Sequence, residues 1–172
     1  MKILFAAAEA LPFIKVGGLG DVAGALPKAL VAKGHDVRVV LPLYSSIRQE
    51  MRDKCRYLKY FYFMHGWRNS YCGIFEAEVD GVIYYLIDNE YYFRRRAPYG
   101  EFDDGERFAY FSRAVLEILP QVDFFPDIIH ANDWHTAAIP VYLDCQYRWR
   151  EGYDYIKTVF SIHNIEFQGK YG

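Results

Sequence analysis

The sequence is poor in cysteine, has no excess of charge of one sign and has no long hydrophobic segment. Its three cysteines, Cys55, Cys72 and Cys145, are scattered and form no CxxC pair. This pattern argues against a disulfide framework or a zinc ribbon and favours a reducing compartment. Twenty basic and twenty-two acidic residues give a formal net charge of −2, which offers no general attraction to nucleic acid or an anionic membrane. No apolar run approaches the roughly 18 residues of a membrane helix. We therefore expect a cytoplasmic protein with neither nucleic acid nor a membrane among its partners.

The composition is that of a folded domain. Hydrophobic residues make up 52% of the 172 residues and charged residues 24%, a balance that excludes disorder. Aromatic residues reach 19%, which suits either a bulky core or stacking on flat ligands. For the aromatic segment 57–64, core and hairpin packing is favoured over a stripe that stacks on glycans.

The start of the chain predicts a βαβ unit. Residues 2–8 form a continuous apolar run without alternation, which is typical of a strand covered on both faces. Residues 21–33 carry apolar side chains at helical spacing, and residues 36–41 read as a second strand. Pro27 lies inside the predicted helix, so the helix is expected to kink or to restart there.

The middle of the chain predicts antiparallel strands. Residues 56–64, 71–79 and 82–87 are rich in residues that favour β-strands, and Asp80-Gly81 between the last two is a strong hairpin signal. A polar, tyrosine-rich loop is expected for residues 88–105.

The parallel pattern then resumes. We predict a helix over 108–119, a strand over 127–130, a helix over 134–147 and a strand over 157–162. The whole pattern predicts an α/β fold, a Rossmann-like doubly wound, mainly parallel sheet that carries an inserted β-hairpin region.

Polar residues follow three of the predicted parallel strands. These segments are 15–21 after the first strand, 130–135 after the strand at 127–130, and His163-Asn164 after the last. In open parallel sheets ligands bind outside the carboxyl ends of the strands, so we expect these three segments to form one site.

The first segment, from Lys15 to Asp21, favours phosphate binding. Gly17 and Gly18 allow backbone N–H groups to converge beside a helix N-terminus, and Lys15 adds a positive charge. The alternative is a tight strand-to-helix turn with a solvated lysine. The spacing is neither G-x-G-x-x-G nor a P-loop, and the second strand ends at Leu41 without a ribose-binding carboxylate. These departures argue against an NAD-dependent oxidoreductase.

Asp133 has three interpretations. It could ligate a metal with His130, His135 and His163, although this spacing matches no known metal motif. It could cap the helix that begins at Trp134. It could also be a pocket carboxylate that orients sugar or phosphate-ester hydroxyls, which is compatible with a capping role.

Three sequence blocks resemble one enzyme family. They are KVGGLGDV at 15–22, HANDWH at 130–135 and SIHNIEFQG at 161–169. In order and type they resemble the bacterial glycogen synthases and plant starch synthases, which are retaining glucosyltransferases that use ADP-glucose. The resemblance implies the N-terminal half of a GT-B fold, in which two Rossmann-like domains face a cleft. We expect residues 1–172 to be the N-terminal starch or glycogen synthase catalytic domain in truncated form. The C-terminal nucleotide-binding domain of the enzyme is expected to be absent from this chain and to be its partner.

The resemblance also implies roles for eight residues. His163 beside the anomeric carbon and Asp133 in the glucosyl pocket are expected to be catalytic. The expected substrate-binding residues are Lys15, Gly17, Gly18, Asp21, Tyr99 and Asn164. Lys15 is expected to contact the donor diphosphate, with backbone donors from the two glycines. No metal or other cofactor is expected, because Lys15 and helix dipoles would stabilise the departing diphosphate.

The reaction implied is transfer of glucose from ADP-glucose to the non-reducing end of an α-1,4-glucan acceptor in glycogen biosynthesis. Since the nucleoside pocket belongs to the second domain, the fragment is expected to fold but to be inactive. The alternative is a non-catalytic glycan- or phosphate-binding module of the same fold.

Overall fold

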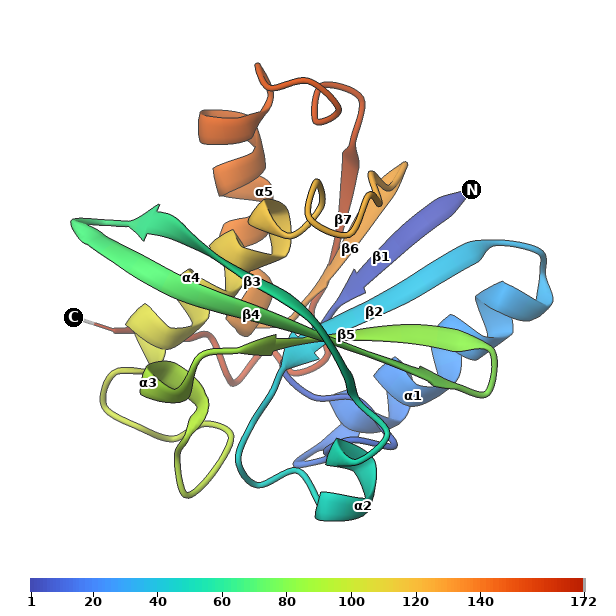
Figure 1. Ribbon diagram of the computed structural model, residues 1–172, viewed down its shortest axis with the longest axis horizontal. Helices are drawn as coiled ribbons and strands as arrows, with labels where there is room; N and C mark the ends of the chain where they lie inside the picture. Colours follow the sequence, from blue (N-terminus) through green and yellow to red (C-terminus); the bar gives the residue numbers. More distant parts are fainter. Residues whose placement is uncertain (172) are drawn as a thin grey trace.

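A seven-stranded mixed sheet lies at the centre of the computed structural model, which describes residues 1–171 (Figure 1). In chain order the strands are β1 (Lys2–Ala6), β2 (Asp36–Pro42), β3 (Arg56–His65), β4 (Arg68–Val79), β5 (Val82–Asp88), β6 (Ile128–Asn132) and β7 (Lys157–Ser161). Their order across the sheet is β3-β4-β5-β2-β1-β6-β7. The pairs from β5 to β7 are all parallel, whereas β4 is antiparallel to both of its neighbours.

Helices cover both faces of the sheet. Helix α1 (Gly18–Ala32) lies on one side, and α4 (Asp104–Glu117) and α5 (Ala138–Tyr142) lie on the other (Figure 1). The remaining helical segments are α2 (Gln49–Arg52), α3 (Glu90–Phe93), the 3₁₀ turn η1 (Trp134–Thr136) and the π-helical turn η2 (Leu143–Tyr147). This is the predicted doubly wound α/β fold. None of the helices in the described part of the chain is long and apolar enough to cross a membrane.

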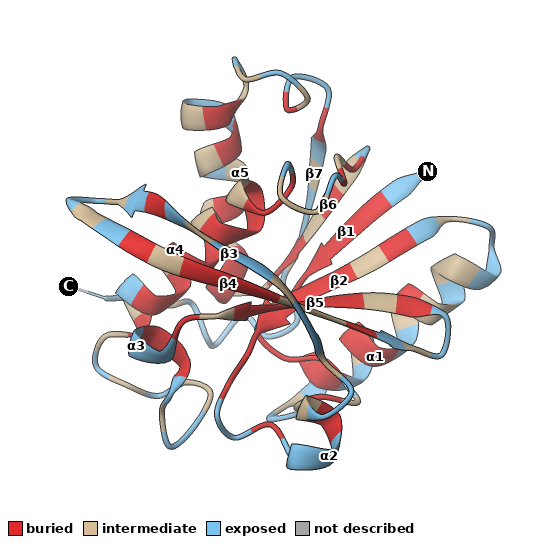
Figure 2. Ribbon diagram, in the orientation of Figure 1, coloured by how far each residue is buried: buried red, intermediate tan, exposed pale blue. Residues whose placement is uncertain are grey.

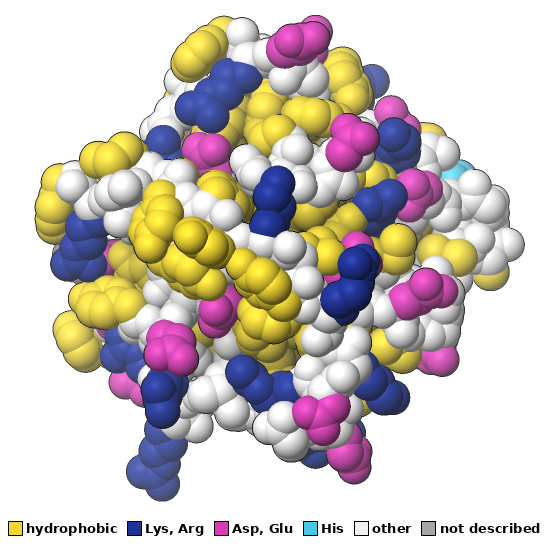
Figure 3. Space-filling view, viewed as in Figure 1, with side chains coloured by type: hydrophobic (Ala, Val, Ile, Leu, Met, Phe, Trp, Pro, Cys, Tyr) yellow, Lys and Arg dark blue, Asp and Glu magenta, His cyan; other side chains and the backbone are white. Residues whose placement is uncertain are grey.

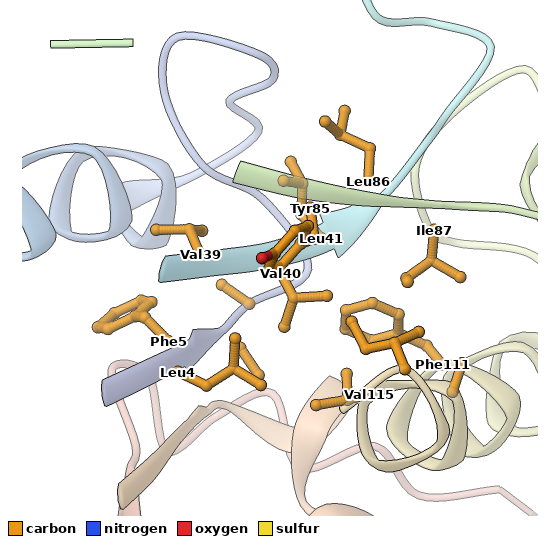
Figure 4. Close-up of a cluster of buried hydrophobic side chains, with 14 of the residues drawn as sticks. Leu4, Phe5, Val39, Val40, Leu41, Tyr85, Leu86, Ile87, Phe111 and Val115 are labelled. Atoms are coloured by element: carbon orange, nitrogen blue, oxygen red, sulfur yellow. The ribbon is translucent and has the colours of Figure 1, made fainter. Parts of the chain in front are cut away.

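The central strands β1 and β2 are buried because each has a parallel neighbour on both sides and a helical layer on both faces. Figure 2 shows the core running through β1, β2 and β5. In Figure 4, Val40 and Ile87 point from β2 and β5 toward Phe111 and Val115 of α4. A strand in this position needs apolar residues at successive positions, which explains why the first strand shows no alternation.

The inserted hairpin region is also confirmed. Asp80 and Gly81 have φ angles of 52° and 76° and connect β4 to β5, as a tight turn with two left-handed residues requires. The aromatic segment packs in the core and across the hairpin, as expected. Phe63 is buried against α4, whereas Tyr60 and Tyr62 are more than half exposed on the edge strand β3 and pack against Tyr71 of β4. Figure 3 shows hydrophobic side chains gathered on the face over β3 and β4.

Three local expectations differ from the structure. Helix α1 continues through Pro27 without a break and begins three residues before the predicted start at 21. The helix predicted for 134–147 is divided into η1, α5 and η2. The loop predicted for 88–105 contains the short helix α3, whose Tyr92 and Phe93 are buried in the core.

One histidine is part of the core. The ring of His135 is 7% exposed and stacks on Trp134 at 4.1 Å between ring centroids, with Phe108 at 4.6 Å and Tyr99 at 4.8 Å. Neither ring nitrogen has a hydrogen-bond partner within residues 1–171. Burial, and to a smaller extent the positive charge of Arg107, lower the pKa of His135 from 6.5 to about 3.

We expect this histidine to make the fold sensitive to mild acid. The unfolded chain takes up a proton on His135 below about pH 6.5, whereas the folded protein does so only near pH 3. The free energy of unfolding should therefore fall as the pH drops through this window, by up to about 1.4 kcal/mol per pH unit. His135→Phe keeps a flat ring but cannot bind a proton, so its unfolding free energy should fall less steeply between about pH 6 and pH 4.5.

Urea denaturation at a series of pH values measures this slope. Ser112→Ala is the matched control, because it removes the hydrogen bond from the Ser112 hydroxyl to the His135 carbonyl but leaves the ring in place. It should lower stability equally at each pH. Equal slopes for the parent protein and His135→Phe would contradict the assignment.

Candidate functional site

A cavity of about 940 Å³ opens at the carboxyl ends of the central strands. The chain order reverses between β1 and β6, since β2 and β5 lie on one side of β1, and β6 and β7 on the other. Such a switch point is where open α/β sheets bind ligands. The segments that follow β1, β6 and β7 all line this cavity, together with the loop that precedes α4. The structure thus brings together the three segments that the sequence singles out.

The predicted site residues divide into two groups. The cavity is lined by Gly17, Gly18, Tyr99, Asp133, His163 and Asn164. Lys15 and Asp21 are not among the lining residues. They form an ion pair with each other, with 2.7 Å between Lys15 Nζ and Asp21 Oδ2, and both side chains are about half exposed.

A buried carboxylate lies under the glycine turn. Glu9 is 1% exposed, lines the cavity and accepts hydrogen bonds from the backbone N–H groups of Val16, Gly17 and Gly20. The Gly17 N–H, expected as a donor to phosphate, is therefore already engaged within the protein. The first N–H groups of a helix have no intrahelical acceptor, which leaves those of Gly18 and Leu19 for a ligand.

Sequence reasoning missed the role of Glu9. The available signal was a carboxylate directly after an apolar strand and a few residues before a glycine-rich turn. A buried carboxylate needs hydrogen-bond donors, and the backbone of such a turn supplies several at once.

Asp133 has an unusual backbone and an unexpected partner. Its φ of 58° and ψ of 177° fall in a region that is essentially restricted to glycine and costs about 1–3 kcal/mol. Its side chain makes no capping bond to η1, so the helix-cap interpretation is wrong. Instead, Oδ1 accepts a hydrogen bond from the backbone N–H of His163 at 2.7 Å. The carboxylate therefore joins the ends of β6 and β7.

His163 is held at a second point. Its ring Nε2 lies 2.9 Å from Oδ1 of Asn132, the fully buried last residue of β6. The sequence analysis did not single out Asn132. An amide that ends an otherwise apolar strand was the signal that could have identified it.

The histidines do not form a metal site. His130 Nε2 lies 2.8 Å from the Ser161 hydroxyl, and the ring nitrogens of His135 are enclosed among aromatic rings. Within residues 1–171, no group of three or more His, Cys, Asp or Glu side chains is placed to hold a metal ion. The metal interpretation of Asp133 therefore has no geometric support.

Tyr99 lines the cavity from the loop that precedes α4. Its ring packs against His135, and its pKa is raised by burial and by the negative charges of Glu9 and Asp133. The hydroxyl therefore stays protonated and can donate a hydrogen bond to a ligand. The cavity thus combines carboxylate acceptors, a phenol donor, an imidazole and a helix N-terminus, a set that suits a polyhydroxylated ligand carrying an anionic group.

Comparisons with known proteins agree over the whole chain. The family model described as the starch synthase catalytic domain matches residues 2–172. The glycogen synthase of Clostridium kluyveri is 58% identical over 171 residues, which is 99% of this chain and 36% of that protein. The glycogen synthase of Streptococcus agalactiae is 54% identical over 172 residues, again 36% of its length.

A solved structure gives the same result. The catalytic domain of starch synthase IV from Arabidopsis thaliana, bound to ADP and acarbose, superposes with a TM-score of 0.86 at 39% identity and covers 97% of this chain and 34% of that one. The chain thus spans about a third of the length of its relatives. By sequence and by fold, it belongs to the starch synthase catalytic domain family.

Proposed function

We propose that this chain is part of a retaining glucosyltransferase that transfers glucose from ADP-glucose to the non-reducing end of an α-1,4-glucan in glycogen biosynthesis. The observation that carries the proposal is the single cavity at the switch point, on which Asp133, His163 and the glycine turn converge. The names of the relatives, glycogen synthases and a starch synthase with ADP and acarbose bound, support this chemistry.

In this proposal, Asp133 and His163 are the catalytic residues that hold the transferred glucosyl group. The Asp133 Oδ1 atom is occupied by the His163 N–H, so Oδ2 is left to accept a hydrogen bond from a sugar hydroxyl. Tyr99 and Asn164 line the same cavity and add a phenol and an amide. The strained backbone of Asp133 supports a functional role, because such strain persists where the surrounding structure requires it.

Lys15 and the turn at Gly17 and Gly18 are proposed to handle the donor diphosphate, with the N–H of Gly18 as a backbone donor because that of Gly17 is engaged by Glu9. Asp21 is proposed as a further substrate-binding residue. An exposed ion pair contributes about 0–1 kcal/mol, so Lys15 can exchange Asp21 for a phosphate at little cost. A charged hydrogen bond to phosphate contributes about 1.5–3 kcal/mol. A Cβ at Gly18 would meet no atom within 4 Å, so packing does not require glycine there, which supports close approach of a ligand. Lys15 and the N-terminus of α1 would stabilise the leaving diphosphate, and we propose no metal or cofactor.

We propose that residues 1–172 form the N-terminal domain and that a C-terminal nucleotide-binding domain of a longer protein supplies the nucleoside pocket. The chain's share of about a third of its relatives' length supports this division. A cytoplasmic location is proposed because Cys55, Cys72 and Cys145 are all free thiols.

The roles of the site residues predict different kinetic effects in the full-length enzyme. Lys15→Ala should weaken both donor binding and stabilisation of the leaving diphosphate, so it should raise the KM for ADP-glucose as well as lower kcat, and should lower kcat/KM by roughly 10- to 100-fold because one charged hydrogen bond is lost. Asp133→Ala and His163→Ala should mainly lower kcat. Steady-state kinetics with a glycogen acceptor measure both parameters.

Lys28→Ala is the matched control for the lysine. Lys28 also forms an exposed ion pair, with Asp80 in the β4–β5 turn, and it does not line the cavity. It should leave both parameters near their parent values. Near-normal kinetics for all three site variants would contradict the site assignment.

Activity of the isolated chain tests the proposal that the nucleoside pocket lies in a separate C-terminal domain. Purified residues 1–172 should incorporate no radiolabelled glucose from ADP-glucose into glycogen, because the nucleoside pocket lies in the other domain. Incorporation by the isolated chain would contradict the proposal. A full-length protein that binds maltooligosaccharides but never turns over ADP-glucose would instead be the alternative, a non-catalytic binding module.

A further inference from the structure

Asn132 occupies the point where β1, β6 and β7 meet below the cavity. It is the last residue of β6, its side chain is fully buried, and its amide contacts groups from β1, from β6 and from the segment after β7. We propose that Asn132 is a positioning residue that fixes the tautomer of His163, with the proton on Nε2 and the lone pair on Nδ1.

The orientation of the Asn132 amide follows from its surroundings. Nδ2 lies 3.1 Å from the Ala6 carbonyl oxygen and 3.0 Å from the His130 carbonyl oxygen. Both of these groups can only accept hydrogen bonds, so the nitrogen must face them. The reversed amide would place Oδ1 against two carbonyl oxygens in a buried site, and both hydrogen bonds donated by Nδ2 would be lost. The Oδ1 atom therefore faces His163.

The orientation of the amide determines the protonation of the histidine. Asn132 Oδ1 is an acceptor only, and it lies 2.9 Å from His163 Nε2. The Nε2 atom must therefore be the donor, and in the neutral ring Nδ1 carries the lone pair. The backbone N–H of the same residue is held by Asp133 Oδ1 at 2.7 Å. Two adjacent residues at the end of β6 thus hold both the backbone and the ring of His163.

The charged and titratable neighbours leave this assignment intact. Asp133 contacts the backbone of His163 through Oδ1, and the His130 ring is engaged with the Ser161 hydroxyl at 2.8 Å. The Asn132 oxygen is the hydrogen-bond partner of the His163 ring within residues 1–171. The tautomer is therefore set by a neutral amide, which itself cannot titrate.

The consequence for the reaction rests on the proposed function. If His163 lies beside the transferred sugar, its Nδ1 presents an acceptor, and a sugar hydroxyl must be the donor. The opposite tautomer would present a donor and would oppose the same hydroxyl. We therefore expect loss of the Asn132 acceptor to lower kcat of the full-length enzyme by roughly tenfold, about the effect of one hydrogen bond.

The tautomer can be observed directly. The chain contains only five histidines, so selective ¹⁵N-histidine labelling gives few ring signals, which long-range ¹H–¹⁵N correlation spectra at mildly alkaline pH can resolve. The signals that disappear in His163→Gln are those of His163. The parent chain should show Nε2 as the protonated nitrogen. Asn132→Leu, which keeps the branching of the side chain but has no acceptor, should show a mixture of tautomers.

Thr136→Val is the control for a general loosening of this turn. The Thr136 hydroxyl is buried and donates to the Asn132 carbonyl oxygen at 2.8 Å, so its loss destabilises the same segment without touching the His163 ring. It should leave the tautomer unchanged. An Nδ1–H ring in the parent chain, or an unchanged Nε2–H ring in Asn132→Leu, would overturn the proposal. Normal turnover of His163→Ala would refute the function proposed for the histidine but not its tautomer.

Discussion

The candidate site depends on the hydrogen bond between the Asp133 carboxylate and the backbone N–H of His163. Parallel pairing of β1, β6 and β7 brings their carboxyl ends to one edge of the sheet, but pairing alone does not fix the segments that follow. The bond from His163 to Asp133 connects the segment after β7 to the end of β6, and the bonds of Asn132 connect the same point to β1. The Asp133 carboxylate and the Asn132 amide, adjacent in sequence, thus connect the ends of β1, β6 and β7 by hydrogen bonds.

The electrostatics of the glycine turn differ from those of a simple phosphate loop. Three of its backbone N–H groups converge on the Glu9 carboxylate, so an internal anion takes up part of the positive potential that the turn would offer. The positive potential available to an incoming phosphate then comes from the N-terminus of α1 and the ammonium group of Lys15. The exposed pair of Lys15 with Asp21 keeps this ammonium close to the turn without burying it. Glu9 therefore supports the shape of the turn, while Lys15 provides the charge for a ligand.

The sequence predicted those features that depend on local patterns. The uninterrupted apolar run identified β1, Asp80-Gly81 identified the β4–β5 turn, and polar residues after three strands located the cavity. Features that depend on contacts between segments were missed. Glu9 acts through the backbone of the glycine turn, and Asn132 through Ala6 and His163, which the fold brings near. The sequence carried a signal for each residue but did not identify its partner. The aromatic segment of β3 was predicted to pack in the core and in the hairpin, and its rings do both, but alternation could not show which of its two faces a helix would cover.

The strain at Asp133 follows from what this residue must do at once. Its backbone N–H bonds the Ser161 carbonyl at 2.9 Å, which ties β6 to β7, while its side chain must reach back to the N–H of His163, two residues beyond Ser161. A glycine would adopt this φ and ψ more readily, but it would lack the carboxylate that holds His163. An aspartate with an ordinary backbone would direct its side chain elsewhere, since the direction of Cβ follows from φ and ψ. The protein therefore retains about 1–3 kcal/mol of strain at the residue whose carboxylate defines the cavity, which is where a fold is expected to give up stability for function.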